Sequence, residues 1–381
     1  MKQVNSGTNR TNYAGNGTGA AKRQPEGQTT KAQIPAVRPM SIMPVMSDKF
    51  FDQPVSQVDG KLMKLNRRVL PNLPLKADEI DRRLSVMVNW SDSKANQGLE
   101  LKGLYNHSRV LSLNVKFADR YGNAYDYLAF KGVGIPKKSK NGGICKKPVY
   151  FNVFDSEAVF GMERTQNALH DWECSNLFLR NGMHTTVPVA LIKLGGVLSI
   201  DGKHVTLDEA VKGRVLPETR ECRDRQCKFV PVLYLKGFSE IARVVDMDYY
   251  SYMSAANERG LGIREYTNML MRESARNVAI IHNLGFAHGY LTSHNIAADG
   301  AVVDFDSISS ADPRSIAKDV EKAMNTLEET KLKAFRTKTF FEEYFKNRKG
   351  VTSAQKEELV KVMKAELSGN DVTELIALAR K

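Results

Sequence analysis

Residues 288–295, His-Gly-Tyr-Leu-Thr-Ser-His-Asn, and the following Asp304-Phe-Asp306 carry the side chains best suited to chemistry. Between them, Asp299-Gly300 is a hairpin-type turn signal that leads into a short apolar strand. Such a hairpin brings the Asn295 amide and the Asp304 carboxylate to one end of a small sheet. These hard oxygen ligands suit Mg²⁺, which takes few protein ligands and leaves the rest to phosphates and water. The alternative is an ordinary turn stabilised by Asp and Asn.

The same spacing can be compared with the chemistry of protein kinases. Kinases hold Mg²⁺ with a catalytic-loop Asn and with the Asp that opens the next segment, as Asn295 and Asp304 would do here. They also place a catalytic Asp two residues after the loop His, where this chain has Tyr290. We expect His288 to be structural, with its ring bonded to backbone. Asp306 is a possible second metal ligand or a hydrogen-bonding residue of the loop.

Several periodic segments must position these residues. Alternating apolar residues predict an antiparallel hairpin over 110–117 and 125–131, which ends in Lys131-Gly-Val-Gly134. The pattern then predicts a helix at 156–181, strands at 187–194, 229–235 and 241–245, a helix at 263–284 and further helices after 314. Strands first and helices later indicate an α+β fold with a strand-rich N-lobe and a helical C-lobe.

Composition divides the chain into three parts. Residues 1–45 are rich in Gly, Asn, Thr, Gln and Pro, which predicts a disordered basic tail. Residues 46–245 form the expected N-lobe-like nucleotide-binding region, with a polar inserted loop at 195–226. Residues 246–381 form the helical C-lobe, which contains the catalytic and metal loop at 288–306.

Charge and apolar content limit the possible partners. The 381 residues contain no long apolar run and no signal-peptide pattern, so we expect a cytoplasmic protein without membrane contact. The net charge of +13 favours nucleotide phosphates, and nonspecific nucleic-acid contact is a further expectation. The four cysteines are too scattered for a disulfide framework and are expected to be free thiols.

Four motifs in the same order resemble the selenoprotein-O (SelO) pseudokinases. Residues 278–295 resemble that family's helix and His-Gly…Asn loop, and the interval from Asn295 to Asp304 also fits. Phe130-Lys-Gly-Val-Gly134 resembles its Leu-Lys-Gly-Ala-Gly strand end. Residues 175–191 resemble its helix leading into a Pro-Thr-Thr-Arg-Ala-Leu strand. The resemblance covers about residues 110–310 and implies a protein-kinase-like fold that transfers AMP from ATP to protein hydroxyl groups.

The resemblance also implies roles for individual residues. Lys131 would hold nucleotide phosphates, and Asn295 and Asp304 would bind Mg²⁺. The acidic partner of Lys131 would be Asp171, with Glu163 and Glu173 as alternatives. The family's two further phosphate-binding arginines would correspond to Lys236 and Arg243.

The chain departs from the family pattern in its catalytic loop. SelO proteins carry an Asp just before the Asn, whereas this chain has His294, a candidate base. Gln97-Gly98 to Gly103 is only a faint version of the family's Gly-Asp-Gly segment. We expect a SelO-like enzyme that uses ATP and Mg²⁺, with protein Ser, Thr or Tyr as acceptor. The alternatives are a kinase-like phosphotransferase and an inactive pseudokinase that acts as a binding platform.

Overall fold

The computed structural model describes residues 49–91, 99, 101–151, 159–217, 229–328 and 337–363. Its strands are β1 (Phe50–Gln53), β2 (Val55–Gln57), β3 (Gly60–Leu65), β4 (Val86–Val88), β5 (Leu101–Leu104), β6 (Val110–Ala118), β7 (Ala124–Lys131), β8 (Tyr150–Phe151), β9 (Val159–Phe160), β10 (Glu163–Arg164), β11 (Val187–Leu194), β12 (Gly196–Leu198), β13 (His204–Thr206), β14 (Pro231–Phe238), β15 (Phe286–Ala287) and β16 (Ser309–Ser310). Its α-helices are α1 (Ala77–Arg83), α2 (Lys140–Cys145), α3 (Thr165–Arg180), α4 (Leu207–Lys212), α5 (Tyr249–Glu258), α6 (Ile263–Asn283), α7 (Pro313–Glu328), α8 (Thr337–Asn347) and α9 (Ser353–Met363).

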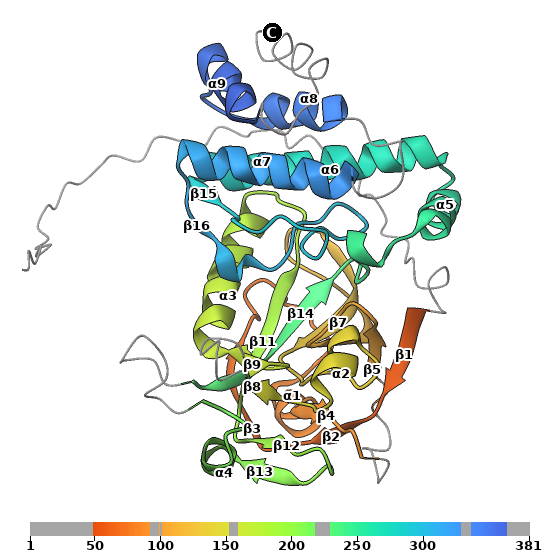
Figure 1. The fold of residues 1–381 in the computed structure, drawn as a ribbon, viewed down its shortest axis with the longest axis vertical. Coiled ribbons are helices and arrows are strands. Elements are labelled where there is room, and N and C mark those ends of the chain that lie inside the picture. The colour runs from red at the N-terminus through yellow and green to blue at the C-terminus, as the bar shows by residue number, and fades with distance from the viewer. Residues whose placement is uncertain are drawn as a thin grey trace, which may run out of the picture. The chain divides into compact units, whose positions relative to one another are not determined.

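One antiparallel sheet forms the first part of the described chain (Figure 1). Its strand order is β1-β5-β6-β7-β14-β11-β3, and the short β10 also pairs with β14. The register places Lys131 opposite Tyr234, so Lys236, two residues beyond Tyr234, lies on the same face of the sheet as Lys131. Two ammonium groups on neighbouring strands therefore point to the same side.

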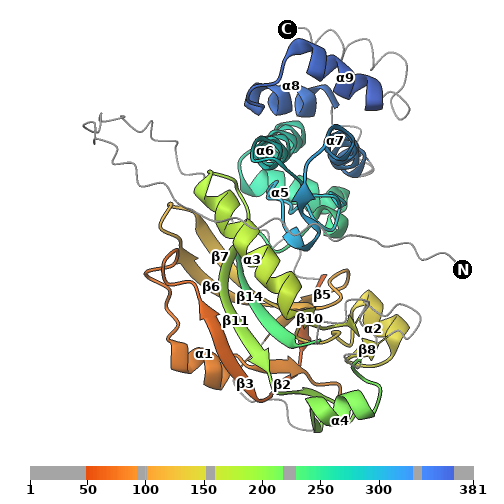
Figure 2. The same ribbon diagram turned by 90° about the vertical axis from the view of Figure 1, so that its left-hand side faces the viewer.

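Helix α3 packs against this sheet and connects it to the helical part (Figure 2). Its Ala168 and Trp172 contact the apolar side chains of β11 and β14. In its last turn, Phe178 belongs to a different apolar core, which is built mainly from α5, α6, α7 and α8. The helix therefore buries residues in both cores, which limits its movement relative to either.

None of the helices in the described part of the chain has the length and apolarity needed to cross a membrane.

The α+β class, with strands first and helices later, is confirmed. The hairpin of β6 and β7, the strand β11 and the helix α6 occur close to their predicted ranges. The expected tail lies outside the described residues. The first part of the expected inserted loop is instead ordered as the β12–β13 hairpin and α4.

Three predicted elements differ from the structure. The short apolar strand expected after Asp299-Gly300 is reduced to isolated bridges of Val302 with Ile296 and Thr185. The helix expected at 156–181 starts only at Thr165, because Glu163 and Arg164 are held as β10 by pairing with β14. The strand expected at 241–245 does not form. There the Asp246 carboxylate accepts a hydrogen bond from the Arg243 backbone N–H at 2.9 Å and closes a 3₁₀ turn.

A polar cluster around His184 joins the sheet to the hairpin that precedes Asp304. The His184 ring contacts Ser239 Oγ at 3.0 Å and Asp299 Oδ2 at 3.2 Å, and Glu273 on α6 lies 3.7 Å away. Although burial alone would lower it, Asp299 and then Glu273 raise the pKa of His184 to about 9. The ring is therefore charged at neutral pH and links three segments.

We expect replacement of His184 by Gln to remove a pH-dependent part of the stability. Because the pKa of His184 is higher in the folded state than in the unfolded state, the charged ring contributes its full stabilisation of the fold below pH 6.5. This contribution is lost as the pH rises to about 9. Urea unfolding across this range should show the free energy of unfolding of the wild type falling relative to that of the variant, by at most about 3 kcal/mol. Parallel curves for the two proteins would contradict the assignment.

Candidate functional site

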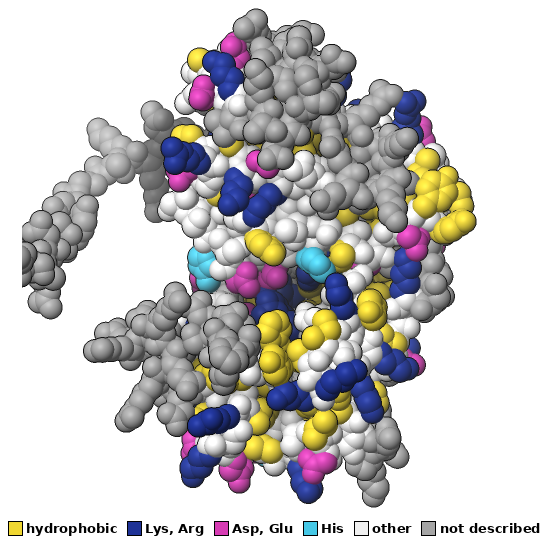
Figure 3. Space-filling model, viewed as in Figure 1, with side chains coloured by type: hydrophobic (Ala, Val, Ile, Leu, Met, Phe, Trp, Pro, Cys, Tyr) yellow, Lys and Arg dark blue, Asp and Glu magenta, His cyan; other side chains and the backbone are white. Residues whose placement is uncertain are grey.

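A cleft of about 460 Å³ lies between the sheet and the loop that precedes α7. It is lined by Asn106, His107, Ser108, Arg109, Val110, Lys131, Lys140, Asn141, Arg243, Tyr290, His294, Asn295, Asp304, Asp306 and Ser307. Figure 3 shows it as a hollow that contains acidic and basic side chains, with a histidine at its border. The structure thus brings together five predicted residues from three separate segments of the sequence: Lys131, Arg243, and the group of His294, Asn295 and Asp304.

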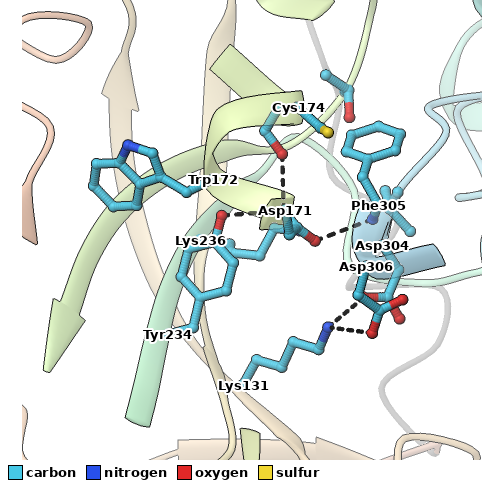
Figure 4. A network of polar contacts seen from close by, with 12 residues as sticks. Lys131, Asp171, Trp172, Cys174, Tyr234, Lys236, Asp304, Phe305 and Asp306 are labelled. Atoms are coloured by element: carbon cyan, nitrogen blue, oxygen red, sulfur yellow. Dashed lines mark hydrogen bonds and ion pairs between the residues drawn. The ribbon is translucent and has the colours of Figure 1, made fainter. Parts of the chain in front are cut away.

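The Lys131 side chain points toward the carboxylates of Asp304 and Asp306 (Figure 4). It ends β7 and is only 5% exposed. Its Nζ donates to the Asp304 carboxylate and lies 3.4 Å from Glu163 Oε2 and 3.6 Å from Asp306 Oδ2. A buried ammonium group needs such partners because burial strongly disfavours an unpaired charge.

Glu163 is the one of the three candidate acids that lies within ion-pair distance of Lys131. It comes from β10 and approaches closely because Gly132 has no side chain: a Cβ there would lie 2.7 Å from the Glu163 Cβ. Gly132 also has a φ of 90°, which favours glycine. Burial raises the pKa of Glu163, although Lys131 and Arg109 oppose this effect. Glu173 instead pairs with Lys64 at the surface, at 2.8 Å.

Asp171 does not pair with Lys131 but with Lys236 on the next strand. The Lys236 Nζ donates to both carboxylate oxygens, at 2.9 and 2.8 Å, and both side chains are buried. Lys236 and then Lys131 outweigh the effect of burial and lower the pKa of Asp171. The carboxylate also accepts hydrogen bonds from Ser175 Oγ, Tyr234 OH and the Phe305 backbone N–H. Asp171 therefore ties α3, β14 and the Asp304 segment together.

Asp304 has a left-handed backbone conformation, with φ of 69° and ψ of 72°. Residues other than glycine rarely adopt it, and where they do, surrounding contacts must hold them. Here the next residue, Phe305, donates its N–H to Asp171 Oδ2 at 3.1 Å, and its ring packs against Phe178. Against the effect of burial, Lys131 and Arg109 hold the pKa of Asp304 well below its usual value. The carboxylate is therefore ionised.

The loop before Asn295 is fixed by buried hydrogen bonds. The His288 ring contacts the Val303 carbonyl oxygen at 3.0 Å, in agreement with the expected structural role. The Asn295 Nδ2 donates to the Tyr290 carbonyl oxygen at 2.9 Å, and the Val303 N–H donates to the Asn295 carbonyl oxygen. Because Nδ2 is directed to the backbone, the amide oxygen is the atom that Asn295 can offer to a ligand in the cleft.

His294 is exposed at the edge of the cleft, and its carbonyl oxygen accepts a hydrogen bond from Arg243. Its ring is partly enclosed by the wall of the cleft, and this partial desolvation, followed by the Arg243 guanidinium, lowers the pKa of His294. The imidazole is therefore neutral at pH 7 and able to accept a proton. The Arg243 Nε is buried without a hydrogen-bond partner, so this side chain has an unused donor beside the cleft.

Arg109 is a site residue that the sequence analysis missed. Its guanidinium lies 3.3 Å from Glu163 and 3.5 Å from Asp306. The turn before it is anchored by His107, whose Nε2 is 2.8 Å from Asp246 Oδ2. The available signal was a basic residue directly before the first predicted strand, which by itself does not distinguish a ligand from a surface charge.

The donor set fits Mg²⁺ better than a metal held entirely by protein. Asn295, Asp304 and Asp306 all line the cleft and offer one amide and two carboxylate groups. Across the described ranges, no group of three or more His, Cys, Asp or Glu side chains is placed to hold a metal ion. Mg²⁺ usually takes one or two carboxylates together with substrate phosphates and water. The described residues of this cleft would therefore hold it jointly with a phosphorylated ligand.

No family model and no curated protein matches the sequence. Among solved structures, the chain is similar to the kinase domain of a Toxoplasma gondii specific rhoptry antigen, with 9% sequence identity and a TM-score of 0.29. The match covers 88% of this chain and 95% of that one. This similarity is too low to support an argument about the site.

We expect Lys236→Met to destabilise the protein by about 3–5 kcal/mol, because it leaves the buried Asp171 carboxylate without a cation. Urea unfolding of the single and double variants measures this effect. Lys236→Met combined with Asp171→Asn should be more stable than Lys236→Met alone, since the neutral amide needs no counter-charge. A double variant that is less stable than the single one would show that the loss has another origin.

Proposed function

We propose that this chain is a SelO-like protein adenylyltransferase, which transfers AMP from ATP to a protein hydroxyl group and uses Mg²⁺. The observation that carries the proposal is the arrangement of Lys131, Asn295 and Asp304 around one cleft in which Tyr290 stands where kinases place their catalytic Asp. Such a cleft can position phosphates and neutralise their charge, which is the main requirement of phosphorus transfer.

The inner end of the cleft supports AMP transfer over phosphoryl transfer. A neighbouring cavity there has only about 10 Å³, close to the space of one water, and is lined by Lys131, Lys236, Arg243 and the Asp304 carboxylate together with apolar residues. The apolar residues of its lining, Val110, Ala129 and Phe238, belong to a packed apolar cluster. Neither a purine base nor a phosphate group fits in a space of this size, so the nucleotide would lie in the larger cleft, with its phosphates toward the cations at this end. With the phosphates inward, the α-phosphorus lies nearest the opening and the incoming hydroxyl.

The reaction would then use the following groups. The acceptor hydroxyl oxygen forms a bond to the α-phosphorus while the bond from that phosphorus to the β-bridging oxygen breaks, and pyrophosphate leaves. The neutral His294 imidazole accepts the hydroxyl proton. Lys131, Arg109 and Arg243 balance the phosphate charge.

Asn295 and Asp304 would hold Mg²⁺, which supplies further charge neutralisation when it is bound. Lys236 has a positioning role, because its ammonium group is occupied by Asp171.

Labelled ATP tests the reaction class. The full-length protein, incubated with a cell extract, Mg²⁺ and ATP labelled at the α- or the γ-phosphate, should transfer only the α-label to protein. Asp304→Ala should reduce this transfer at least about a hundredfold, because it removes a metal ligand. Asp201→Ala, in the exposed turn between β12 and β13, is the matched control and should keep full activity. Transfer of only the γ-label would identify a kinase. Absence of both transfer and Mg-ATP binding would leave a binding platform.

The proposed base predicts a distinctive pH profile. His294 acts in its neutral form, and its pKa is lowered below 6.5, so the fall of kcat at acid pH should be centred below pH 6.5. His294→Ala should lower kcat by about 10²–10⁴-fold and remove this acid limb. The rate of α-label transfer at saturating ATP measures both effects. An unchanged acid limb in the variant would assign it to another group.

A further inference from the structure

Helix α7 is held directly against the catalytic loop. The Asp319 Oδ1 accepts a hydrogen bond from the Gly289 N–H at 2.8 Å, and Thr326 Oγ1 donates to the Leu291 carbonyl oxygen at 3.1 Å. Between them, Lys322 Nζ donates to the Gly289 carbonyl oxygen at 2.8 Å. These contacts fix one side of α7 in place beside the opening of the cleft.

A basic stripe, formed by Arg314, Lys318 and Lys322, follows the same helix. The three residues recur every four positions, so they lie on one side of α7, adjacent to the side that contacts the loop. Arg314 and Lys318 are exposed, and within the described residues neither has an acidic partner within ion-pair distance. Asp312 is engaged in capping, since its Oδ1 accepts from the backbone N–H groups of residues 314 and 315. The stripe therefore retains its positive charge.

Tyr290 connects the basic stripe to the reacting groups. Its side chain is 56% exposed and lines the cleft together with His294. The Lys322 ammonium group lies 5.0 Å from the centre of the Tyr290 ring. A ligand that follows the stripe toward its Lys322 end would thus reach Tyr290 and the cleft opening.

The opposite rim of the opening is also basic. Lys140, at the start of α2, is exposed and lines the cleft, and its backbone N–H is fixed by the Tyr105 carbonyl oxygen at 2.8 Å. Figure 3 shows basic side chains both over α7 and below the hollow, while the acidic side chains gather inside it. A ligand that spans the opening therefore meets positive charge on both sides.

We propose that the acceptor is an acidic segment of a polypeptide, which lies along the basic stripe and presents its hydroxyl group past Tyr290 to the cleft. The inference rests on the proposed function and adds the class of acceptor. Charge complementarity argues for acidic residues on either side of the hydroxyl, because like charges across an interface are strongly disfavoured and opposite charges speed encounter. An extended peptide also fits a stripe that runs along a helix and ends at the opening.

Paired peptides test this proposal. Peptides that carry one central Ser, Thr or Tyr, flanked either by Asp and Glu or by Lys and Arg, are incubated with the full-length protein and α-labelled ATP. We expect kcat/KM to be at least about tenfold higher for the acidic peptides and to fall as salt increases. The double variant Arg314→Glu with Lys318→Glu should abolish or reverse this preference and leave the KM for ATP unchanged.

The matched control is Lys61→Glu with Lys193→Glu, which changes the net charge equally. These exposed lysines face each other across β3 and β11, at the far edge of the sheet from β5 and β6. The control should keep the preference for acidic peptides. Equal effects of the two double variants would mean that only net charge matters, and equal kcat/KM for both peptide types would exclude the proposal.

Binding without turnover separates this inference from the proposed function. If no peptide or protein is labelled, AMP transfer is excluded, and fluorescence anisotropy of the acidic peptide still tests the stripe: tighter binding to wild type than to the stripe variant supports it. Single-stranded RNA is the competitor for the other class of acidic ligand. If the stripe variant loses affinity for RNA but keeps its affinity for the acidic peptide, the stripe is a nucleic-acid surface and the proposal is overturned.

Discussion

Two buried ammonium groups on neighbouring strands are the constraint on which the rest of the site depends. Lys131 and Lys236 point to the same face of the sheet and are 5% and 2% exposed. Each requires an acidic partner, because an isolated charge cannot be buried without a large cost in free energy. The partners come from separate segments: Glu163 and Asp304 for Lys131, and Asp171 for Lys236. Meeting both requirements brings β10, α3 and the Asp304 turn to one place.

Asp171 extends this constraint to the helical part of the protein. It fixes the Phe305 backbone, so the left-handed turn at Asp304 is determined by a residue on α3. The same turn follows the hairpin whose Asp299 contacts the charged His184. Beyond it, the loop that carries Asn295 is bonded to α7 through Asp319. A change in the buried pair would therefore be expected to alter the positions of the proposed metal ligands.

The narrow cavity at the inner end of the cleft affects how a nucleotide would be oriented there, and therefore which reaction is proposed. Because Val110, Ala129 and Phe238 are packed together, the cavity beyond the cleft has no room for a base, and in the proposed function the nucleotide directs its phosphates toward Lys131 and Arg243. In the proposed function, the side chains that face the acceptor at the opening are those of Tyr290, His294 and Lys140. The same fold could serve phosphoryl transfer if the nucleotide were reversed, so in the proposed function the orientation of the nucleotide, and not the proposed metal ligands, decides between the two reactions.

Local patterns in the sequence were sufficient to predict the elements whose formation depends on residues close together in the chain. Alternation over residues 110–131 and the helical period over 263–284 predicted β6, β7 and α6, because each buries one face. The spacing of Asn295 and Asp304 predicted that they would meet, since a hairpin turn at Asp299-Gly300 closes the segment between them.

The tertiary structure alone decided which charges pair. Glu163 reaches Lys131 only because β10 adds to the sheet beside Gly132, and Arg109 enters the cleft only because His107 is anchored to Asp246. Neither contact has a periodic signal, because each joins residues from separate segments whose approach is set by packing of the whole fold.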